Sequence, residues 1–329
     1  MDIARLFTDF HLPIASPGER HYHQGWINTP CPFCSGNPGN HLGYCYDPTS
    51  KFFGRFVCYR CGGKGTLRVL SRLLRIDDEI RLIGIVAKYG IITSWTRNPP
   101  TTTLTKKKKL STKEANLPPL IRCLKEVSGA VRYLRGRKFD PEEIEGLWKV
   151  MATGPGSVIR TGDGKSVDFS YRIIIPVFRK GKLVTYQGRD WTGKSSKKYL
   201  ACPPWAEGWP IKDTLYGVDE ADDAGNGDAV LMEGVTDVWK YGPGAVACFG
   251  IKHRQTQIRE LARRFDRVTI AFDPEGAARI QARKITRELE EWGLEVRSPR
   301  LPRGKDPGDM DREELRRMLR NGKKEMPKM

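Results

Sequence analysis

Hydrophobic and polar residues follow a regular β/α pattern in the C-terminal third of the chain. From Ala229 onward, short apolar runs alternate with segments in which apolar residues recur every three or four positions; the runs are AVLM, AVACFG and VTIAFD, and the segments include RQTQIRELARRF and EGAARIQARKITRELEEWG. The runs are typical of buried strands, and the segments of amphipathic helices. LEVRSPRLP is predicted as a fourth strand. Alternating strands and helices predict a parallel sheet over residues 227–329, which include a C-terminal tail.

The rest of the chain divides into three further regions. Residues 1–90 contain two strand-like pieces, HLGYCY and KFFGRFVC, around a DPTS turn. Residues 91–119 include KKKK, Lys106 to Lys109, among threonines and prolines with little apolar periodicity, which predicts a basic flexible linker. Residues 120–226 are predicted to form a basic α+β subdomain. The expected fold class is therefore α/β, or α+β overall, in three folded parts.

The composition is strongly basic. Among 329 residues, 57 Lys and Arg stand against 39 Asp and Glu, a net charge of +18. This excess favours a nucleic-acid partner, because neutralising phosphates releases counterions. The alternative is a charge that serves only solubility, or thermal adaptation through many ion pairs. There is no run of about 18 apolar residues and no convincing signal peptide. The sequence thus predicts a cytoplasmic protein with no membrane partner.

Four of the eight cysteines form two C-x2-C pairs. The pairs are CPFC, Cys31 and Cys34, and CYRC, Cys58 and Cys61, with 23 residues between them. Two such turns can present four thiolates to one tetrahedral zinc ion. With the strand-like pieces between the pairs, this spacing predicts a small zinc ribbon that holds one structural Zn²⁺.

Other interpretations of these cysteines are weaker. CPFC resembles the redox motif of glutaredoxins, but that motif opens a helix, and SGNPGN follows Cys34 here. His41 and Cys45 lie between the pairs and are alternative ligands, although the strand pattern around Cys45 favours packing. Basic and aromatic residues of the ribbon are candidates for binding a single strand by charge and stacking, with about half of the aromatic side chains expected in the core; they are Lys51, Arg55, Arg60, Phe52, Phe53 and Tyr59.

Acidic residues follow the strands of the predicted parallel sheet. They are Glu233 after the first strand, Asp273 and Glu275 after the third, and Asp306 and Asp309 after the fourth. Parallel sheets place their chemistry beyond the carboxyl ends of the strands. Carboxylates gathered there favour Mg²⁺ or Mn²⁺, the ions used to transfer phosphoryl and nucleotidyl groups. The alternative is that each acid only caps the helix that follows it.

A second phosphate-related pattern is GRDWTGKS, residues 188–195, which fits the phosphate-binding loop G-x4-G-K-[ST]. Such a loop must open a helix whose N-terminus faces the phosphates. Here Pro203 and Pro204 stop any helix within about two turns. The pattern therefore indicates a basic loop rather than an ATPase.

The acidic segments EGVTDV, AFDPEGA and GKDPGD resemble the Toprim motifs of primases, topoisomerases and some nucleases. Upstream, the segments YRIIIPV, GKLVTYQGRDW, KKYL, LYG and AVRYLRGRKFDPEEI are similar to the RNA-polymerase domain of DnaG-type primases. The resemblance implies that residues 120–226 and the Toprim part form this domain, preceded by a zinc ribbon that reads the start site. It implies a DNA primase, which makes short RNA primers from ribonucleoside triphosphates on a single-stranded DNA template.

The resemblance also implies roles for individual residues. Glu233, Asp273, Glu275 and Asp306 would be catalytic and, with Asp309, would bind Mg²⁺ or Mn²⁺; the alternative role of Glu233 is proton transfer. Seven basic residues would position template and nucleotide; they are Arg172, Arg189, Lys194, Lys197, Lys198, Lys212 and Lys305.

Some positions depart from the family pattern. Cys34 replaces the usual histidine ligand, as in the four-cysteine site of phage primase-helicases, Glu275 replaces an aspartate, and Gly308 shifts the last acid to Asp309. No helicase-binding domain follows before Met329, which indicates a compact primase, of a bacterial cell, phage or mobile element, that works with a separate replicative helicase. Two alternatives are a Toprim nuclease and a non-catalytic zinc-ribbon protein that binds single-stranded DNA.

Overall fold

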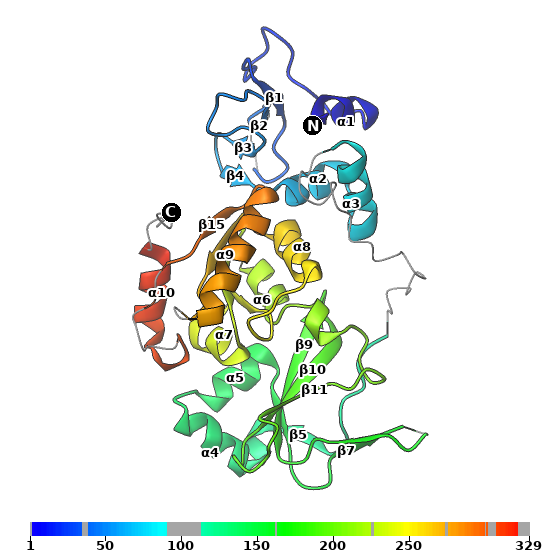
Figure 1. The fold of residues 1–329 in the computed structure, drawn as a ribbon, viewed down its shortest axis with the longest axis vertical. Helices are drawn as coiled ribbons and strands as arrows, with labels where there is room; N and C mark the ends of the chain where they lie inside the picture. The colour runs from blue at the N-terminus through cyan, green and yellow to red at the C-terminus, as the bar shows by residue number, and fades with distance from the viewer. Residues whose placement is uncertain are drawn as a thin grey trace.

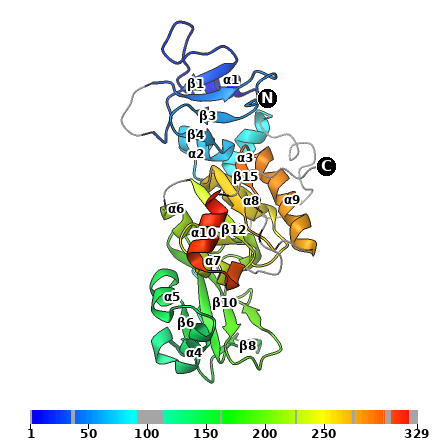
Figure 2. The same cartoon turned by 90° about the vertical axis from the view of Figure 1, so that its left-hand side faces the viewer.

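The computed structural model describes residues 2–34, 39–90, 113–161, 163–224, 227–273, 276–299, 301 and 307–321. Three parts follow one another along the long axis of the molecule (Figure 1). The N-terminal sheet and helices α1–α3 lie at one end, a parallel sheet with its helices lies in the middle, and an antiparallel sheet lies at the other end. The same order is seen after a 90° turn (Figure 2). The mixed α/β architecture with a parallel sheet confirms the expected fold class.

The N-terminal part is a four-stranded antiparallel sheet in the order β1-β2-β3-β4, flanked by helices. Its elements are α1 (Ile3–Asp9), β1 (Trp26–Thr29), β2 (Leu42–Cys45), β3 (Phe56–Cys58), β4 (Gly62–Lys64), α2 (Thr66–Leu74) and α3 (Glu79–Lys88). Tyr44 and Phe56 are buried, with 5.0 Å between their ring centroids. The sequence predicted that about half of three aromatic side chains of this part would be buried in its core. That prediction is wrong, because all three are exposed; they are Phe52, Phe53 and Tyr59.

The basic part is built on a five-stranded antiparallel sheet in the order β11-β10-β9-β6-β5. Its strands are β5 (Ile121–Cys123), β6 (Met151–Thr153), β9 (Arg172–Arg179), β10 (Lys182–Asp190) and β11 (Tyr199–Ala201), with a hairpin of β7 (Val158–Arg160) and β8 (Ser166–Asp168). Its helices are η1 (Leu124–Glu126), α4 (Ser128–Gly136) and α5 (Pro141–Trp148), and η2 (Ile211–Asp213) and α6 (Val218–Asp223) lead from it into the middle part (Figure 1). The isoleucines of YRIIIPV are fully buried on both faces of this sheet, which explains their continuous apolar run.

The predicted linker is described only in part, because residues 91–112 lie outside the described ranges. Its last residues pack against the basic part. The backbone N–H of Ala115 donates to the Leu183 carbonyl at 2.9 Å, and that of Asn116 donates to Ala206 at 2.8 Å. Ala115 is buried. This end of the segment is therefore bound to the sheet.

The middle part contains the predicted parallel sheet. Its strands are β12 (Asp228–Met232), β13 (Ala245–Ala247), β14 (Arg267–Ile270) and β15 (Glu295–Arg297), in the order β13-β12-β14-β15 with parallel pairing throughout. Its helices are α7 (Val235–Tyr241), α8 (Gln255–Arg264), α9 (Gly276–Glu291) and α10 (Arg312–Asn321), with η3 (Pro307–Asp309).

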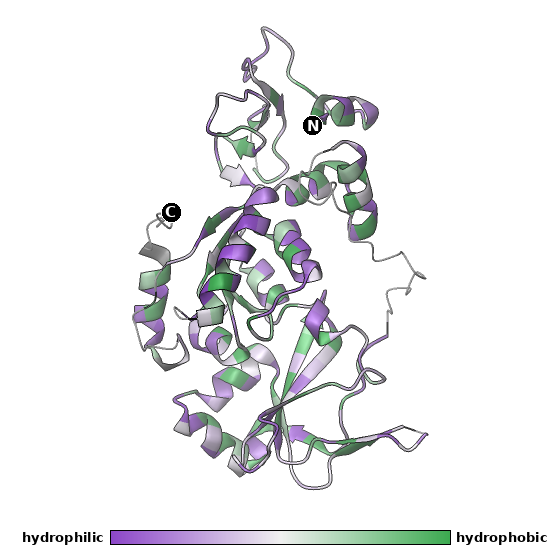
Figure 3. Ribbon diagram, viewed as in Figure 1, coloured by the Kyte–Doolittle hydropathy of each residue, from purple (hydrophilic) through white to green (hydrophobic). Residues whose placement is uncertain are grey.

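The helices of the middle part cover both faces of the sheet. Leu231 and Val268 pack with α8 and α9, whereas Val230 and Met232 pack with α7 and α10. Polar residues lie on the outer sides of these helices (Figure 3). Among the described residues, none of the helices combines the length and apolarity needed to cross a membrane.

The N-terminal part is joined to the middle part through Asp266, the residue before β14. Its carboxylate accepts the Lys64 ammonium at 3.0 Å and the Gly65 backbone N–H at 3.1 Å, and it also pairs with Arg68. A side chain at Gly65 would not fit, since a Cβ there would lie 2.8 Å from the Phe265 carbonyl oxygen. Apolar residues of α2 share one core with α8 and α9. The zinc ribbon is thus held at the amino ends of the parallel strands.

Candidate metal centres and nucleic-acid surface

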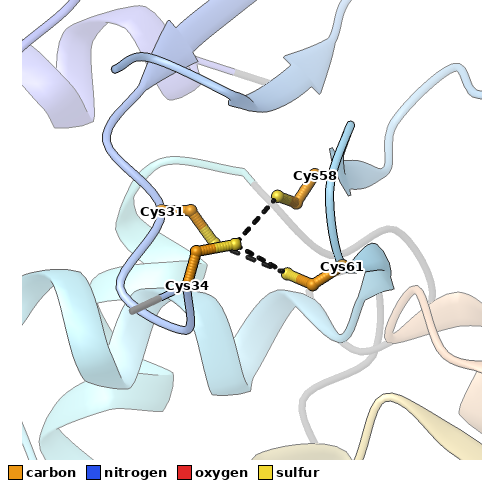
Figure 4. Close-up of side chains that lie close together, drawn as sticks. All are labelled: Cys31, Cys34, Cys58 and Cys61. Atoms are coloured by element: carbon orange, nitrogen blue, oxygen red, sulfur yellow. Dashed lines mark hydrogen bonds between the residues drawn. The ribbon is translucent and has the colours of Figure 1, made fainter. Parts of the chain in front are cut away.

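The four paired cysteines converge on one point (Figure 4). Cys31 and Cys34 come from the loop after β1, whereas Cys58 ends β3 and Cys61 precedes β4. The four Sγ atoms all lie within 4.8 Å of one another, and three pairs are separated by 3.4 to 3.7 Å. A tetrahedral zinc ion with Zn–S bonds of about 2.3 Å needs neighbouring sulfur atoms about 3.8 Å apart. The donor set therefore fits a four-thiolate zinc site.

The ionisation of these thiols favours a cation. Burial raises the pKa of Cys31 to about 11. Burial would also raise the pKa of Cys58, but backbone N–H groups of Cys61 and Arg60 that donate to its sulfur lower that pKa to about 6. Four thiolates this close repel each other, so a divalent cation is what allows all of them to ionise together.

The two other candidate zinc ligands lie outside the cluster. Cys45 is fully buried, and its Sγ lies 3.9 Å from the Asp47 carbonyl, as expected for a packing residue. His41 is buried with Nδ1 3.7 Å from the Cys58 Sγ. This contact puts His41 beside a candidate ligand, where it orients the sulfur.

Two of the predicted acidic residues meet at the carboxyl edge of the parallel sheet. Glu233 follows β12 and Asp273 follows the neighbouring strand β14. The backbone N–H of Asp273 donates to Glu233 Oε1 at 2.9 Å. The Glu233 carbonyl in turn accepts the Gly250 N–H at 2.9 Å, which joins the loop after β13 to the same edge. The arrangement can present carboxylate oxygens to a divalent cation.

The remaining predicted acids are less completely described. Glu275, Asp306 and the basic Lys305 lie outside the described residues. The backbone of Asp309 ends the short helix η3, which contacts α7.

Asp237 is a residue at this edge to which sequence reasoning gave no role. It stands in the first turn of α7, and its Oδ2 accepts the Gly234 N–H at 3.0 Å. The contact fixes the turn that directly follows Glu233. The segment EGVTDV contains the sequence pattern for this contact, because an acidic residue three positions after the N-cap residue is typical of a helix start.

The predicted basic residues separate into an exposed and a buried set. Lys194, Lys197 and Lys198 are exposed on the loop between β10 and β11, named here the lysine loop (residues 191–198). Arg172 and Arg189 are only 5% and 6% exposed. The expectation that Arg189 shares this exposed surface is therefore wrong, because its side chain is buried.

The two buried arginines have distinct surroundings. The Arg172 guanidinium donates to the carbonyls of Gly188 and Lys197 and to Ser195 Oγ, at 3.0 to 3.2 Å. Arg189 lies over the rings of Tyr199 and Tyr133, at 4.5 and 5.6 Å from their centroids. Arg172 thus supports the lysine loop from below, and Arg189 holds β11 and α4 together.

Lys212 lies near the acidic edge. It is exposed, and its Nζ donates to the Phe249 carbonyl at 2.7 Å, one residue before the Gly250 N–H that contacts Glu233. The structure therefore brings one predicted basic residue beside the acids.

The GRDWTGKS loop does not have the form of a phosphate-binding loop. Its amides face its own carboxylate, because Asp190 accepts the backbone N–H groups of Thr192 at 3.2 Å and Ser195 at 3.3 Å. The loop continues into strand β11, not into a helix. An anion-binding helix start requires backbone amides that face the anion and a helix that follows them. This segment has neither feature.

Comparisons with known proteins agree on one family of folds. Residues 230–311 match the family described as Toprim-like. A DNA primase of Clostridium acetobutylicum is 31% identical over 150 residues, which cover 44% of this chain and 25% of that protein. The match thus spans about a quarter of the length of this curated relative.

Two solved structures are similar in fold. The zinc-binding and RNA polymerase domains of Aquifex aeolicus primase align with a TM-score of 0.54 and 20% identity, over 97% of this chain and 83% of that chain. A DnaG primase catalytic domain bound to single-stranded DNA aligns with a TM-score of 0.52 and 23% identity, over 59% and 71%. Residues 230–311 thus match the Toprim-like family, and the chain is similar in fold to the zinc-binding and RNA polymerase domains of the Aquifex aeolicus primase.

Proposed function

We propose that this chain is a DNA primase, which copies a single-stranded DNA template into a short RNA from ribonucleoside triphosphates. The observation that carries the proposal is the hydrogen-bonded pair of Glu233 and Asp273 at the carboxyl edge of a Toprim-like sheet. A four-thiol cluster and an exposed lysine loop in the same chain support it. The similarity to a DNA primase of Clostridium acetobutylicum points to the same activity.

The acids are assigned to metal binding. Glu233 and Asp273 would hold Mg²⁺ or Mn²⁺ together with Glu275, Asp306 and Asp309. A bound divalent cation polarises the α-phosphate and stabilises the charge that develops on the leaving pyrophosphate. Lys212, beside these acids, would hold the triphosphate by charge. As an alternative to metal binding, Glu233 would accept a proton from the attacking hydroxyl group.

The basic residues are assigned to template and nucleotide. Lys194, Lys197 and Lys198 would contact phosphates directly, and Lys305 is proposed to do so near the acids. Arg172 and Arg189 would act from beneath, because their side chains are buried and fix the lysine loop and β11.

The zinc ribbon is assigned to recognition of the template start site. Phe52, Phe53 and Tyr59 are exposed on it, as are Lys51 and Arg60. Exposed aromatic rings among cationic side chains suit stacking of bases along a charged backbone. The proposed partners of the whole chain are the template strand, the nucleotides, the RNA product and a separate replicative helicase. The proposed location is the cytoplasm of a bacterial cell.

One incubation separates the proposed function from its alternatives. The protein is mixed with single-stranded DNA, Mg²⁺ or Mn²⁺ and labelled ribonucleotides, and the products are resolved by size. Short RNA that requires the template supports a primase. Cut DNA without RNA would indicate a Toprim nuclease, and tight binding with neither product would indicate a DNA-binding protein.

A further inference from the structure

Tyr171, the residue before β9, has an unusual backbone for its type. Its φ angle is 58°, in the left-handed region that side chains other than glycine rarely adopt. The conformation is held by two backbone hydrogen bonds, from Tyr171 N–H to the Gly154 carbonyl at 3.0 Å and from Trp191 N–H to the Tyr171 carbonyl at 3.4 Å. The side chain nevertheless remains 42% exposed. Strain of this kind costs free energy and is concentrated at functional sites.

Trp191 supports the ring of Tyr171 from one side. The two rings meet edge to face, with centroids 5.6 Å apart and an interplanar angle of 81°. Trp191 is itself fixed against α4, because a Cβ at Gly129 would lie only 2.3 Å from the indole ring. The indole N–H is buried and has no acceptor in the part of the chain that the structure describes. A buried donor without an acceptor lowers the stability of the folded state. The pair is thus a rigid aromatic unit with one exposed ring.

The surroundings of this unit are cationic. Trp191 begins the lysine loop, on which Lys194, Lys197 and Lys198 are exposed. Arg172, next to Tyr171, fixes that loop through Ser195 and the Lys197 carbonyl. Proteins that bind a single nucleic-acid strand combine these two elements, an aromatic ring for a base and cations for the phosphates.

We propose that Tyr171, backed by Trp191, is a stacking platform for a base of single-stranded DNA, whose phosphates contact the lysine loop. The site deepens the proposed primase function and rests on it for the identity of the strand. Stacking uses the face of the base, so it tolerates any template sequence at this position.

The test measures binding of the full chain to a fluorescent oligothymidylate by anisotropy, as a function of salt. Tyr171→Ala is expected to bind about five- to a hundredfold more weakly, the range for loss of one stacked base. Tyr171→Phe keeps the ring and is expected to bind like wild type. Because no charge is removed, the slope of log affinity against log salt stays unchanged for Tyr171→Ala. For Lys198→Ala the slope flattens by about 0.7.

Leu120→Ala is the matched control. Leu120 also precedes a strand with a positive φ, of 57°, and is 60% exposed, but it is apolar without an aromatic ring. Binding by Leu120→Ala should equal that of wild type. Tyr171→Gly, which is unstrained in this backbone, guards against misfolding and is expected to bind as weakly as Tyr171→Ala.

Three results would overturn the assignment. They are wild-type affinity in Tyr171→Ala, a loss in Tyr171→Phe as large as in Tyr171→Ala, and a Tyr171→Ala defect confined to the KM for nucleotides. Failure of the primase function itself is distinct, because it appears as absence of RNA synthesis by the wild-type protein, whatever the affinity of Tyr171→Ala.

Discussion

The backbone N–H of Asp273 donates a hydrogen bond to Glu233 Oε1, with 2.9 Å between the two atoms. The contact joins the ends of two adjacent parallel strands and orients the Glu233 carboxylate at their edge. Because the donor is a main-chain group, the contact does not require the Asp273 side chain, which stays exposed beside it. A substitution can therefore change the charge at this edge of the sheet without breaking the hydrogen bond that fixes its geometry.

Glu233→Gln should separate these two contributions. The amide oxygen can still accept the Asp273 N–H, so the melting temperature in metal-free buffer should stay within a few degrees of wild type. Loss of the negative charge should lower primer synthesis by roughly a hundredfold or more, the scale of removing one electrostatic group from a reacting site. Both quantities are measured on one preparation.

Asp228→Asn is the matched control for Glu233→Gln. It removes an exposed acid at the opposite end of the same strand, where Asp228 pairs with Arg267. Its synthesis should match wild type. Near-normal synthesis by Glu233→Gln would exclude a catalytic role for this carboxylate.

Cys58→Ser should remove the metal from the N-terminal sheet. Hydroxyl oxygen is a poor replacement for a thiolate, so elemental analysis should find less than one zinc ion per chain. Residues 39–64 should lose structure, because metal binding and folding of such sites are coupled. Initiation on a template should be abolished, and extension of a supplied primer should suffer less. Cys45→Ala, outside the cluster, should retain the zinc, and a wild-type protein purified without chelator but free of zinc would contradict the assignment.

Glu260 should make stability sensitive to acid. It is 3% exposed, and its carboxylate pairs with Arg179 at 2.6 Å, Arg264 at 2.7 Å and Arg263 at 3.1 Å. Burial alone would raise the pKa of this carboxyl, but the arginines lower it to about 2 from 4.5. A lowered folded-state pKa contributes stability above pH 4.5 that is lost as the pH falls toward 2.

The measurement is urea unfolding of wild type and Glu260→Gln at several pH values. At pH 7 the substitution should lower the free energy of unfolding by roughly 3 kcal/mol, because it removes the buried negative charge that three arginines share. Below pH 4.5 the difference between the two proteins should shrink. A constant difference down to pH 3 would show that this carboxylate does not titrate with folding.

Asp266→Ala should loosen the N-terminal part from the Toprim-like part. It leaves the Lys64 ammonium, 7% exposed, without its partner at 3.0 Å and removes the acceptor of Gly65. Breaking a buried ion pair costs about 3 to 5 kcal/mol. Asp228→Ala, which breaks an exposed pair with Arg267, should cost about 1 kcal/mol or less. Equal effects of the two substitutions in chemical denaturation would argue against Asp266 as the main polar contact between the parts.

Much of the fold could be predicted because its signals are local. Apolar runs such as AVLM and VTIAFD indicate buried strands whichever strands they pair with. Each C-x2-C motif indicates by itself a turn that presents two thiols. The order β13-β12-β14-β15 is a tertiary property, and it is this order that makes Glu233 and Asp273 neighbours.

Burial of charged residues could not be predicted in the same way. Arg189 lies in the same basic stretch as Lys198, yet it packs between two tyrosine rings contributed by β11 and α4. In the sequence, nothing distinguishes Asp266 from an acidic residue on the surface. Its partner Lys64 lies some 200 positions earlier and contacts it only in the folded chain. Such contacts depend on the packing of distant elements. Glu275, Asp306 and Lys305 stay predictions, because they lie outside the described residues.

The most direct test of the central claim asks whether the protein starts an RNA chain. Primase activity begins a strand from two nucleoside triphosphates, so the first nucleotide keeps its γ-phosphate. Wild-type protein is incubated with single-stranded DNA, Mg²⁺ or Mn²⁺ and γ-labelled ribonucleotides, beside Asp273→Asn. Template-dependent short RNA that carries the γ-label with wild type, and none with Asp273→Asn, is the predicted result. Absence of γ-labelled RNA with wild-type protein that binds the template and contains zinc would contradict the assignment.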